Sequence, residues 1–178
     1  MKTTIFLFHP DLATSRVNRA LAQGVDNDIE VRDMYKLYPD FKIDTEKEKQ
    51  VLAKSDRVVL QFPMYWYGAP ALVKQWEVES LEAGWAYGIG GDALKGKELL
   101  IAVSPGANNY GREGFAKYTV HELLRPFQAT SRLINMNYLT PFVTIGASHI
   151  SDKDLTDQAK KYNTYLHQEN IPILDNFE

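Results

Sequence analysis

The stretch of sequence that decides the fold runs from Arg57 to Trp76 and reads RVVLQFPMYWYGAPALVKQW. Its apolar run, Val58 to Phe62, has the length and the β-branched content of a strand that is buried on both faces. Pro63 has no backbone N–H, so we expect the chain to leave the sheet there. Met-Tyr-Trp-Tyr follows as a loop, and a glycine and a proline then precede a new helix with apolar residues near helical spacing. The predicted order is strand, aromatic loop, helix.

This aromatic loop follows the carboxyl end of a strand, which is where ligands bind in an open parallel sheet. The backbone N–H groups of Met64 to Tyr67 have no expected partner in the sheet, so they are available to a flat, polycyclic ligand while Trp66 lies against its face. The alternative is that the aromatic side chains only cap the core, because such residues are common in cores. The residues alone leave both interpretations open.

The segment FPMYWYGAPALVKQW, residues 62–76, resembles the signature of the flavin-dependent NAD(P)H:quinone reductases, the DT-diaphorase-like family. The likeness extends from Lys2 to about Gly146. Within the family the chain is most similar to short bacterial members, which include ancillary subunits of glutathione-gated potassium efflux systems and general-stress oxidoreductases. The resemblance implies a set of flavin contacts in this segment, namely Pro63, Met64, Tyr65, Trp66 and Tyr67.

Composition narrows the classes of function. The chain has 178 residues, no cysteine and a formal net charge of −3. This length fits a single domain, expected to span residues 1–178, and the lack of cysteine excludes disulfides and thiolate metal sites. The charge gives no indication of nucleic-acid binding, which needs clustered Lys and Arg. The His residues are scattered without ligand spacing, so no metal site is expected.

The N-terminus, MKTTIFLFHP, contains an apolar run that is too short for a signal peptide. No apolar stretch approaches the roughly 20 residues that span a bilayer. We therefore expect a soluble, cytoplasmic protein, with a peripheral position at the inner face of the cell membrane as the alternative.

Residues 3–8 predict a buried first strand, and residues 14–24 predict a helix that is capped by Thr14 or Ser15. The start of this helix faces the same edge as the aromatic loop, and its free N–H groups and positive dipole end suit a phosphate. No G-x-G-x-x-G fingerprint occurs, so a Rossmann-type dinucleotide site is not expected. Ordinary capping is the alternative role. The segment resembles the family's first phosphate loop, which implies that the flavin phosphate is held by His9, Ser15, Arg16, Val17 and Asn18.

Between the first helix and the central stretch, residues 29–34 alternate apolar and charged side chains, which is typical of an edge strand. A turn-rich loop is expected over residues 35–43, and Thr45 opens a helix with a capping-box pattern. The charge run EKEKQ in this helix predicts a solvent-exposed face.

The Gly-rich segment 82–97 contains GDALKGK, which matches G-x-x-x-x-G-K. Glu98 replaces the Ser or Thr that would bind Mg²⁺, and a strand rather than a helix follows, so we reject a phosphate-binding P-loop. The resemblance implies that this segment reaches across a dimer interface into the substrate pocket, with Tyr87 as the candidate substrate contact. The alternative is that Trp85 and Tyr87 pack on their own domain.

A further buried strand, residues 98–103, ends at a turn-rich segment on the same edge of the sheet. This segment resembles the family's loop that lines the flavin pyrimidine edge with backbone N–H groups. The family's commoner Thr-Thr-Gly-Gly is replaced here by Ser104, Pro105, Gly106 and Ala107. Pro105 supplies no N–H, which puts one of the expected hydrogen bonds in doubt.

In the family, a Tyr and a His stabilise charge on the reduced flavin. Tyr110 stands near the Tyr position and is a candidate for catalysis and for flavin contact. No His stands at the other position, where Lys117 and Tyr118 lie instead. A cation there would favour an anionic reduced flavin by direct charge attraction, which is a hypothesis.

The remaining segments complete the predicted fold. Residues 117–129 indicate a helix with Pro126 as an interior kink, and residues 138–145 indicate a fifth strand that Pro141 places at an edge or bulge. Ser151 begins the last helix. Strands alternating with helices predict a single doubly wound α/β domain of the flavodoxin-like type, a three-layer sandwich with strand order 2-1-3-4-5.

Taken with the resemblance, these features predict an NAD(P)H-dependent flavoprotein that passes hydride from NAD(P)H through the flavin to a quinone-like acceptor. FMN is the expected cofactor, because the chain lacks the C-terminal extension of the long family members that use FAD, and FAD is the alternative. The resemblance implies a homodimer and a small-molecule quinone or other electron acceptor as partner. Two other hypotheses are a regulatory subunit of a membrane transporter and a flavodoxin-type one-electron carrier.

Overall fold

The computed structural model describes residues 1–174, so the expected domain boundary at residue 178 lies outside the described residues. A parallel sheet in the order β2-β1-β3-β4-β5, with β6 also paired to β4, forms the middle layer. The strands are β1 (Thr3–Leu7), β2 (Glu30–Asp33), β3 (Arg57–Pro63), β4 (Glu98–Ser104), β5 (Asn137–Tyr138) and β6 (Phe142–Val143). The helices are α1 (Arg16–Gln23), α2 (Met34–Leu37), α3 (Thr45–Lys54), α4 (Ala71–Ser80), α5 (Val120–Leu123), α6 (Arg125–Leu133) and α7 (Asp152–Leu166). The predicted strand order and flavodoxin-like fold are confirmed.

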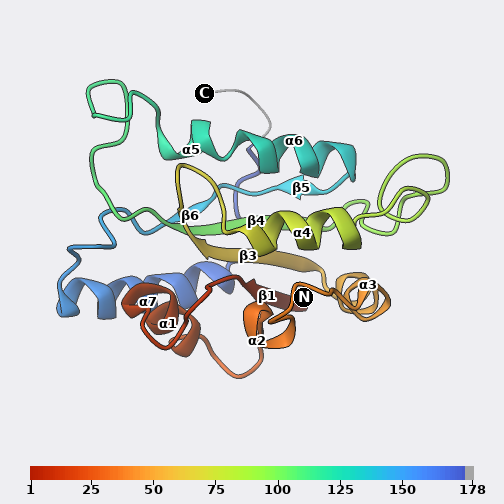
Figure 1. The fold of residues 1–178 in the computed structure, drawn as a ribbon, viewed down its shortest axis with the longest axis horizontal. Coiled ribbons are helices and arrows are strands. Elements are labelled where there is room, and N and C mark those ends of the chain that lie inside the picture. Colours follow the sequence, from red (N-terminus) through yellow and green to blue (C-terminus); the bar gives the residue numbers. More distant parts are fainter. Residues whose placement is uncertain (175–178) are drawn as a thin grey trace.

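Strand β3 is the centre of the sheet, and every one of its residues is buried. It pairs in parallel with β1 on one side and with β4 on the other. Leu60 and Phe62 face one core, which also contains residues of α4 and α6, whereas Val59 faces the core of α1 and α7. Figure 1 shows α4, α5 and α6 on one side of the sheet and α1 and α7 on the other. The prediction of a strand buried on both faces is confirmed.

The chain leaves the sheet slightly later than the sequence indicated. Pro63 is the last residue of β3 and lies opposite Ser104. The N–H of Met64 then donates to the carbonyl oxygen of Ser104 over 3.1 Å. A proline at the last position of a strand costs the sheet little hydrogen bonding, because only its own N–H is missing and the neighbouring residues still pair.

Two other predicted elements are interrupted. The segment expected to be one helix over residues 117–129 forms α5 and α6, which are separated at Leu124. Pro126 lies in the first turn of α6, where a missing N–H costs nothing, so it begins a helix instead of kinking one. The expected fifth strand consists of β5 and β6 on either side of Pro141, which confirms the predicted irregularity. The loop expected over residues 35–43 contains the short helix α2.

The predicted solvent-exposed face of α3 is wrong at Glu48, whose side chain is fully buried. Its carboxylate accepts hydrogen bonds from Arg32, from the Tyr38 hydroxyl and, over 3.1 Å, from Trp76 Nε1. Glu48 lies four residues before the buried Leu52 and therefore on the same inward face of the helix. Burial and the hydrogen bond to Glu48 raise the pKa of Tyr38, which keeps the phenol protonated as a donor. This buried cluster joins β2, α3 and α4.

Within residues 1–174, none of the helices combines the length and the apolar character that crossing a bilayer requires.

Replacing the buried carboxylate tests the importance of this cluster. We expect Glu48→Gln to lower the free energy of unfolding by about 3 kcal/mol, because the buried Arg32 keeps only the partly exposed Glu30, at 3.6 Å, as a counter-charge. Urea denaturation followed by circular dichroism measures the change. Glu46→Gln on the same helix is the matched control, since the Glu46 side chain is 78% exposed, and its effect should be several times smaller. Equal effects of the two variants would contradict the prediction.

Candidate functional site

A cavity of about 300 Å³ opens at the carboxyl edge of the sheet, between the loops that follow β1, β3, β4 and β6. Its lining residues are His9, Ser15, Arg16, Val17, Asn18, Pro63, Met64, Tyr65, Ser104, Gly106, Ala147 and Ser148. All of these except Ala147 and Ser148 were candidates from the sequence. The structure therefore brings the expected loops together around one cavity.

The loop after β6 completes this cavity and was missed from the sequence. The N–H of Ala147 donates to the carbonyl oxygen of Pro105 over 2.9 Å, and the N–H of Ser148 donates to that of Gly106 over 3.1 Å. These bonds fix the loop after β4 against the loop after β6. The sequence did contain an indication of this loop, because Gly146, Ala147 and Ser148 are small or turn-forming residues that follow the predicted fifth strand at the same edge.

The start of α1 forms one end of the cavity. Ser15 is the N-cap, and its Oγ accepts the N–H of Asn18 over 3.1 Å. The N–H groups of Arg16 and Val17 have no partner within residues 1–174 and so remain available to an anion. The Arg16 guanidinium binds Asp152 Oδ1 over 2.6 Å and the carbonyl oxygen of Ile150 over 3.1 Å. The Arg16 charge is therefore partly neutralised by the Asp152 carboxylate. The free backbone N–H groups are the stronger attraction for an anion.

A buried polar network supports this end of the cavity. Asn18 Nδ2 donates to Ser104 Oγ over 2.8 Å, and Gln61 Nε2 donates to the Asn18 carbonyl oxygen over 2.9 Å. The Tyr162 hydroxyl donates to Gln61 Oε1 over 3.1 Å, and burial raises the pKa of Tyr162, which keeps it protonated. The network ties α1 to β3, β4 and α7. Gln61 was not predicted, although a glutamine inside an otherwise apolar strand was a visible signal.

His9 lies on the wall of the cavity as a neutral donor. Its Nδ1 accepts the N–H of Asp11 over 3.1 Å, which leaves the proton on Nε2. Partial burial lowers the pKa of His9 below its usual value, against smaller opposing effects of Asp11 and Asp33. The imidazole is therefore uncharged at neutral pH and offers one N–H. Its ring lies edge-on to Tyr65 at 6.5 Å between centroids.

The aromatic loop forms a tight hairpin turn. Tyr65 and Gly68 exchange two backbone hydrogen bonds of 2.9 Å, which leaves Trp66 and Tyr67 at the corner with φ of 48° and 64°. Two-residue turns of this kind favour Asn-Gly, because non-glycine residues are strained at positive φ. Trp66 is nevertheless 96% exposed, so it does not cap the core.

Because of this turn, fewer backbone N–H groups are free than the sequence indicated. The N–H of Met64 pairs with Ser104 and that of Tyr65 pairs with Gly68. Of the segment from Met64 to Tyr67, only the N–H groups of Trp66 and Tyr67 lack a partner among the residues that the structure describes. The turn is therefore a rigid aromatic corner with two available donors.

The loop after β4 contributes further donors. The N–H groups of Gly106 and Ala107 have no partner in the described part of the chain, whereas Pro105 has no N–H to offer. A Cβ added at Gly106 would lie 2.7 Å from Ser148 Oγ, so a larger residue there requires the Ser148 side chain to move. The glycine thus lets the two loops approach closely without displacing the Ser148 side chain.

Tyr110 lies beside the aromatic turn, with its ring 6.5 Å from that of Tyr67 in an edge-on arrangement. Burial raises the pKa of Tyr110, and Tyr67 adds a smaller effect in the same direction. A second, largely apolar cavity of about 350 Å³ begins here. It is lined by Tyr110, Gly111, Thr119, Val120, His121, Val143 and Ile145.

Two groups of sequence candidates line neither cavity: the first, on the loops after β3 and β4 that border the first cavity, is Trp66, Tyr67, Pro105 and Ala107, and the second is Lys117, Tyr118 and Tyr87. Lys117 and Tyr118 are exposed, and neither lines either cavity. Tyr87 lies on the loop between α4 and β4, at the amino edge of the sheet, where it is partly buried against its own core together with Trp85. Figure 1 shows this loop at the opposite end of the sheet from the loop that joins β3 to α4.

The sheet order and the anion-ready helix start at its carboxyl edge define a protein of the flavodoxin-like class. A family model described as flavodoxin-like fold matches residues 1–166, and the chain belongs to this family.

Two curated relatives are informative. The chain is 47% identical over 173 residues to an uncharacterized NAD(P)H oxidoreductase, YrkL, of Bacillus subtilis, with 95% of this chain and 99% of the relative covered. It is 35% identical over 169 residues to the glutathione-regulated potassium-efflux system ancillary protein KefG of Pectobacterium atrosepticum, with 93% and 92% covered.

Solved structures agree on the fold. The general stress protein 14 of Treponema denticola in complex with FMN matches with a TM-score of 0.87 and 37% identity, covering 93% of this chain and 98% of that one. An NADPH-quinone reductase from P. pentosaceus matches with a TM-score of 0.84 and 30% identity, covering 96% and 100%. A structure described as a tryptophan halogenase from Streptomycin violaceusniger matches with a TM-score of 0.92 and 42% identity, covering 94% and 100%.

The strained turn makes a prediction about stability. We expect Trp66→Asn to raise the free energy of unfolding by up to about 1 kcal/mol, because Asn tolerates positive φ and the exposed ring buries little. Trp66→Ala is the control, since it removes the ring without relieving the strain. Urea denaturation of both variants measures the difference. Equal stability of the Asn and Ala variants would show that the turn stores no strain.

Proposed function

We propose that the chain is a flavin-dependent NAD(P)H oxidoreductase that uses FMN and reduces a quinone-type acceptor. The observation that carries the proposal is the meeting of an anion-ready helix start, an exposed aromatic turn and a loop with free N–H groups at one edge of the sheet. The names of the relatives, an NAD(P)H oxidoreductase, an FMN-bound stress protein and an NADPH-quinone reductase, support the same class.

The residues fit the parts of FMN. His9 Nε2 and the N–H groups of Arg16 and Val17 would hold the phosphate, because they offer uncommitted donors at a helix start. Trp66 and Tyr67 would contact the ring system, and an exposed Trp at a strained position is difficult to explain by stability. When bound, FMN supplies the hydride chemistry, and the chain supplies position and electrostatics.

The loop after β4 would recognise the polar edge of the flavin. The free N–H groups of Gly106 and Ala107 are suited to ring carbonyl oxygens, and Ser104 takes part by holding Asn18 in place. Pro105 would contribute shape and no hydrogen bond. This division of tasks follows from which backbone groups the fold leaves unpaired.

Of the catalytic candidates, Tyr110 has the best support. Its raised pKa keeps the phenol protonated at neutral pH, so it would serve as a hydrogen-bond donor beside the aromatic turn. The apolar cavity that begins at Tyr110 suits a flat acceptor such as a quinone. Roles for Lys117 and Tyr118 would require their loop to move toward the cavity, because both side chains now face solvent.

We further propose that the functional form is a homodimer in which Tyr87 contacts the substrate of the second copy. Support comes from position, because the loop with Tyr87 lies at the opposite edge of the sheet from its own cavity. The same loop carries Ile89, which is fully exposed. Covering an apolar loop tip of this kind with a second copy removes apolar surface from water and so stabilises a dimer.

The visible spectrum of the protein tests the proposed reaction. After reconstitution with FMN or FAD, we expect a retained flavin absorption band that is bleached by NADPH or NADH without oxygen and restored by a quinone. Riboflavin, which lacks the phosphate, is the control and should be retained more weakly. A chain that retains no flavin would contradict the proposal. Stopped-flow reduction that shows one-electron cycling in place of hydride transfer would favour an electron carrier.

Gly106 provides a sharper test of the cavity. We expect Gly106→Ala to weaken FMN binding by up to about tenfold, because the new Cβ displaces the Ser148 hydroxyl in the wall of the cavity and narrows the space for the ligand. Fluorescence titration with FMN measures the dissociation constant. The double variant Gly106→Ala with Ser148→Ala should recover most of the affinity, since the nearest remaining atom, Ser148 Cβ, lies at 3.9 Å. If Gly106→Ala alone bound FMN as tightly as the wild type, the prediction that this loop contacts the flavin would be contradicted.

A second candidate function is favoured by the potassium-efflux ancillary proteins among the relatives. The 35% identity to a potassium-efflux ancillary protein supports a role as the regulatory subunit of a membrane transporter. Such a subunit would be a peripheral protein at the membrane. Affinity purification of the tagged chain from membranes, followed by mass spectrometry, tests this role. Co-purification of an integral membrane transporter supports it, and the absence of one contradicts it.

A further inference from the structure

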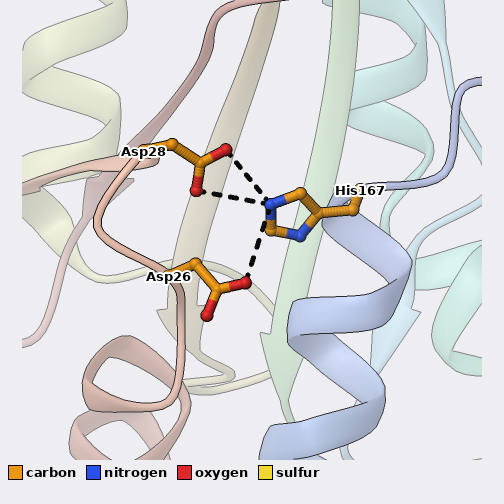
Figure 2. A group of neighbouring side chains, drawn as sticks. All are labelled: Asp26, Asp28 and His167. Atoms are coloured by element: carbon orange, nitrogen blue, oxygen red, sulfur yellow. Dashed lines mark hydrogen bonds and ion pairs between the residues drawn. The ribbon is translucent and has the colours of Figure 1, made fainter.

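A cluster of metal-ligating side chains lies away from the flavin cavity. Asp26 and Asp28 are on the loop between α1 and β2, and His167 follows the last residue of α7. Since α1 and α7 run opposite to the strands, this cluster is at the amino edge of the sheet. Figure 2 shows the His167 ring directed between the two carboxylates.

The histidine is held in the orientation that a metal ligand needs. Its Nδ1 lies 2.8 Å from the carbonyl oxygen of Asn163, so Nδ1 carries the proton and Nε2 bears the lone pair in the neutral ring. Nε2 is 3.3 Å from Asp28 Oδ2 and 3.9 Å from Asp26 Oδ2. A lone pair facing two carboxylates is repulsive unless a proton or a metal cation lies between them. The backbone bond at the other nitrogen is the usual support of a metal-binding histidine.

The carboxylates are also held in place. Asn163 Nδ2 donates to Asp26 Oδ2 over 2.9 Å, and the N–H of Asp26 donates back to Asn163 Oδ1 over 3.0 Å. Asn163 therefore contacts both His167 and Asp26, as outer partners of metal ligands commonly do. One residue thus orders two ligands from segments far apart in the sequence, Asp26 through its side chain and His167 through its backbone carbonyl group.

The ligand atoms lie close enough together to converge on a small divalent ion. Zn²⁺ binds imidazole nitrogen and carboxylate oxygen at about 2.0–2.2 Å, so tetrahedral angles place neighbouring ligand atoms about 3.3–3.6 Å apart. One ligand atom from each of Asp26, Asp28 and His167 lies within 4.8 Å of the others. Small rotations of the three side chains would bring these atoms to the spacing that Zn²⁺ requires, because all three side chains are partly exposed and free to turn.

We propose that Asp26, Asp28 and His167 bind a divalent transition-metal ion such as Zn²⁺, with water in the remaining position. One nitrogen and two carboxylate oxygens suit Zn²⁺ better than Mg²⁺, which prefers oxygen ligands alone. The ion replaces the proton on Nε2 and neutralises the two acids. It also joins the loop before β2 to the end of α7, and so stabilises the folded chain by mass action.

Calorimetric titration of the metal-stripped full chain with ZnCl₂ tests the proposal. We expect one saturable site in the wild type, at least about tenfold weaker binding in His167→Gln and in Asp28→Asn, and about tenfold weaker binding in Asn163→Ala, which keeps all three ligands. His149→Gln is the control, because it removes an exposed histidine outside the cluster and should bind Zn²⁺ like the wild type.

Two outcomes would overturn the proposal. One is the absence of saturable Zn²⁺ binding by the wild type. The other is equal weakening in His167→Gln and His149→Gln, which would show only unspecific binding by surface histidines. Because the titration needs no flavin, its failure would leave the proposed reductase activity untouched, and failure of flavin binding would leave the metal site untouched.

Discussion

The parallel pairing of β3 with β1 and β4 is the constraint on which the rest of the structure depends. Both faces of β3 are buried, so its backbone groups must find their partners within the sheet. Polar and turn-forming residues are thereby confined to the strand ends. Since parallel strands end at the same edge, the loops after β1, β3, β4 and β6 meet there and leave N–H groups for a ligand.

Two buried polar clusters then fix the position of the helices on this sheet. Gln61, Asn18 and Ser104 tie the start of α1 to the ends of β3 and β4, and Glu48 ties α3 to Arg32 on β2. Each cluster satisfies groups that would be costly if left unpaired in the core. The donors at the start of α1 are therefore held rigidly, which lowers the entropic cost of binding a phosphate.

The fold and the meeting of its loops at one edge could be predicted, because they depend on local patterns: buried strands, helix caps, and turns after strands. The individual cavity residues were implied by the family resemblance. The features that were missed depend on contacts between distant segments. Glu48 is buried because of Arg32 and Trp76, neither of which its own charge run reveals. The hydrogen bonds of the turn at Trp66 depend on backbone angles that Trp and Tyr rarely adopt. His167 has acidic neighbours 139 residues away, which no spacing rule detects.

The helices α1 and α7 connect the two edges of the molecule. At the carboxyl edge, Asp152 at the start of α7 binds Arg16 at the start of α1, beside the cavity. At the amino edge, Asn163 and His167 of the same helix end contact the loop that follows α1. With its 15 residues α7 is about 22 Å long, and it packs directly against α1. A cation at the amino edge would therefore restrain the same helix pair that presents the N–H groups proposed to bind the FMN phosphate. Any effect of the metal on flavin binding would pass through this pair and would change the affinity for FMN more than that for riboflavin, since only FMN carries the phosphate.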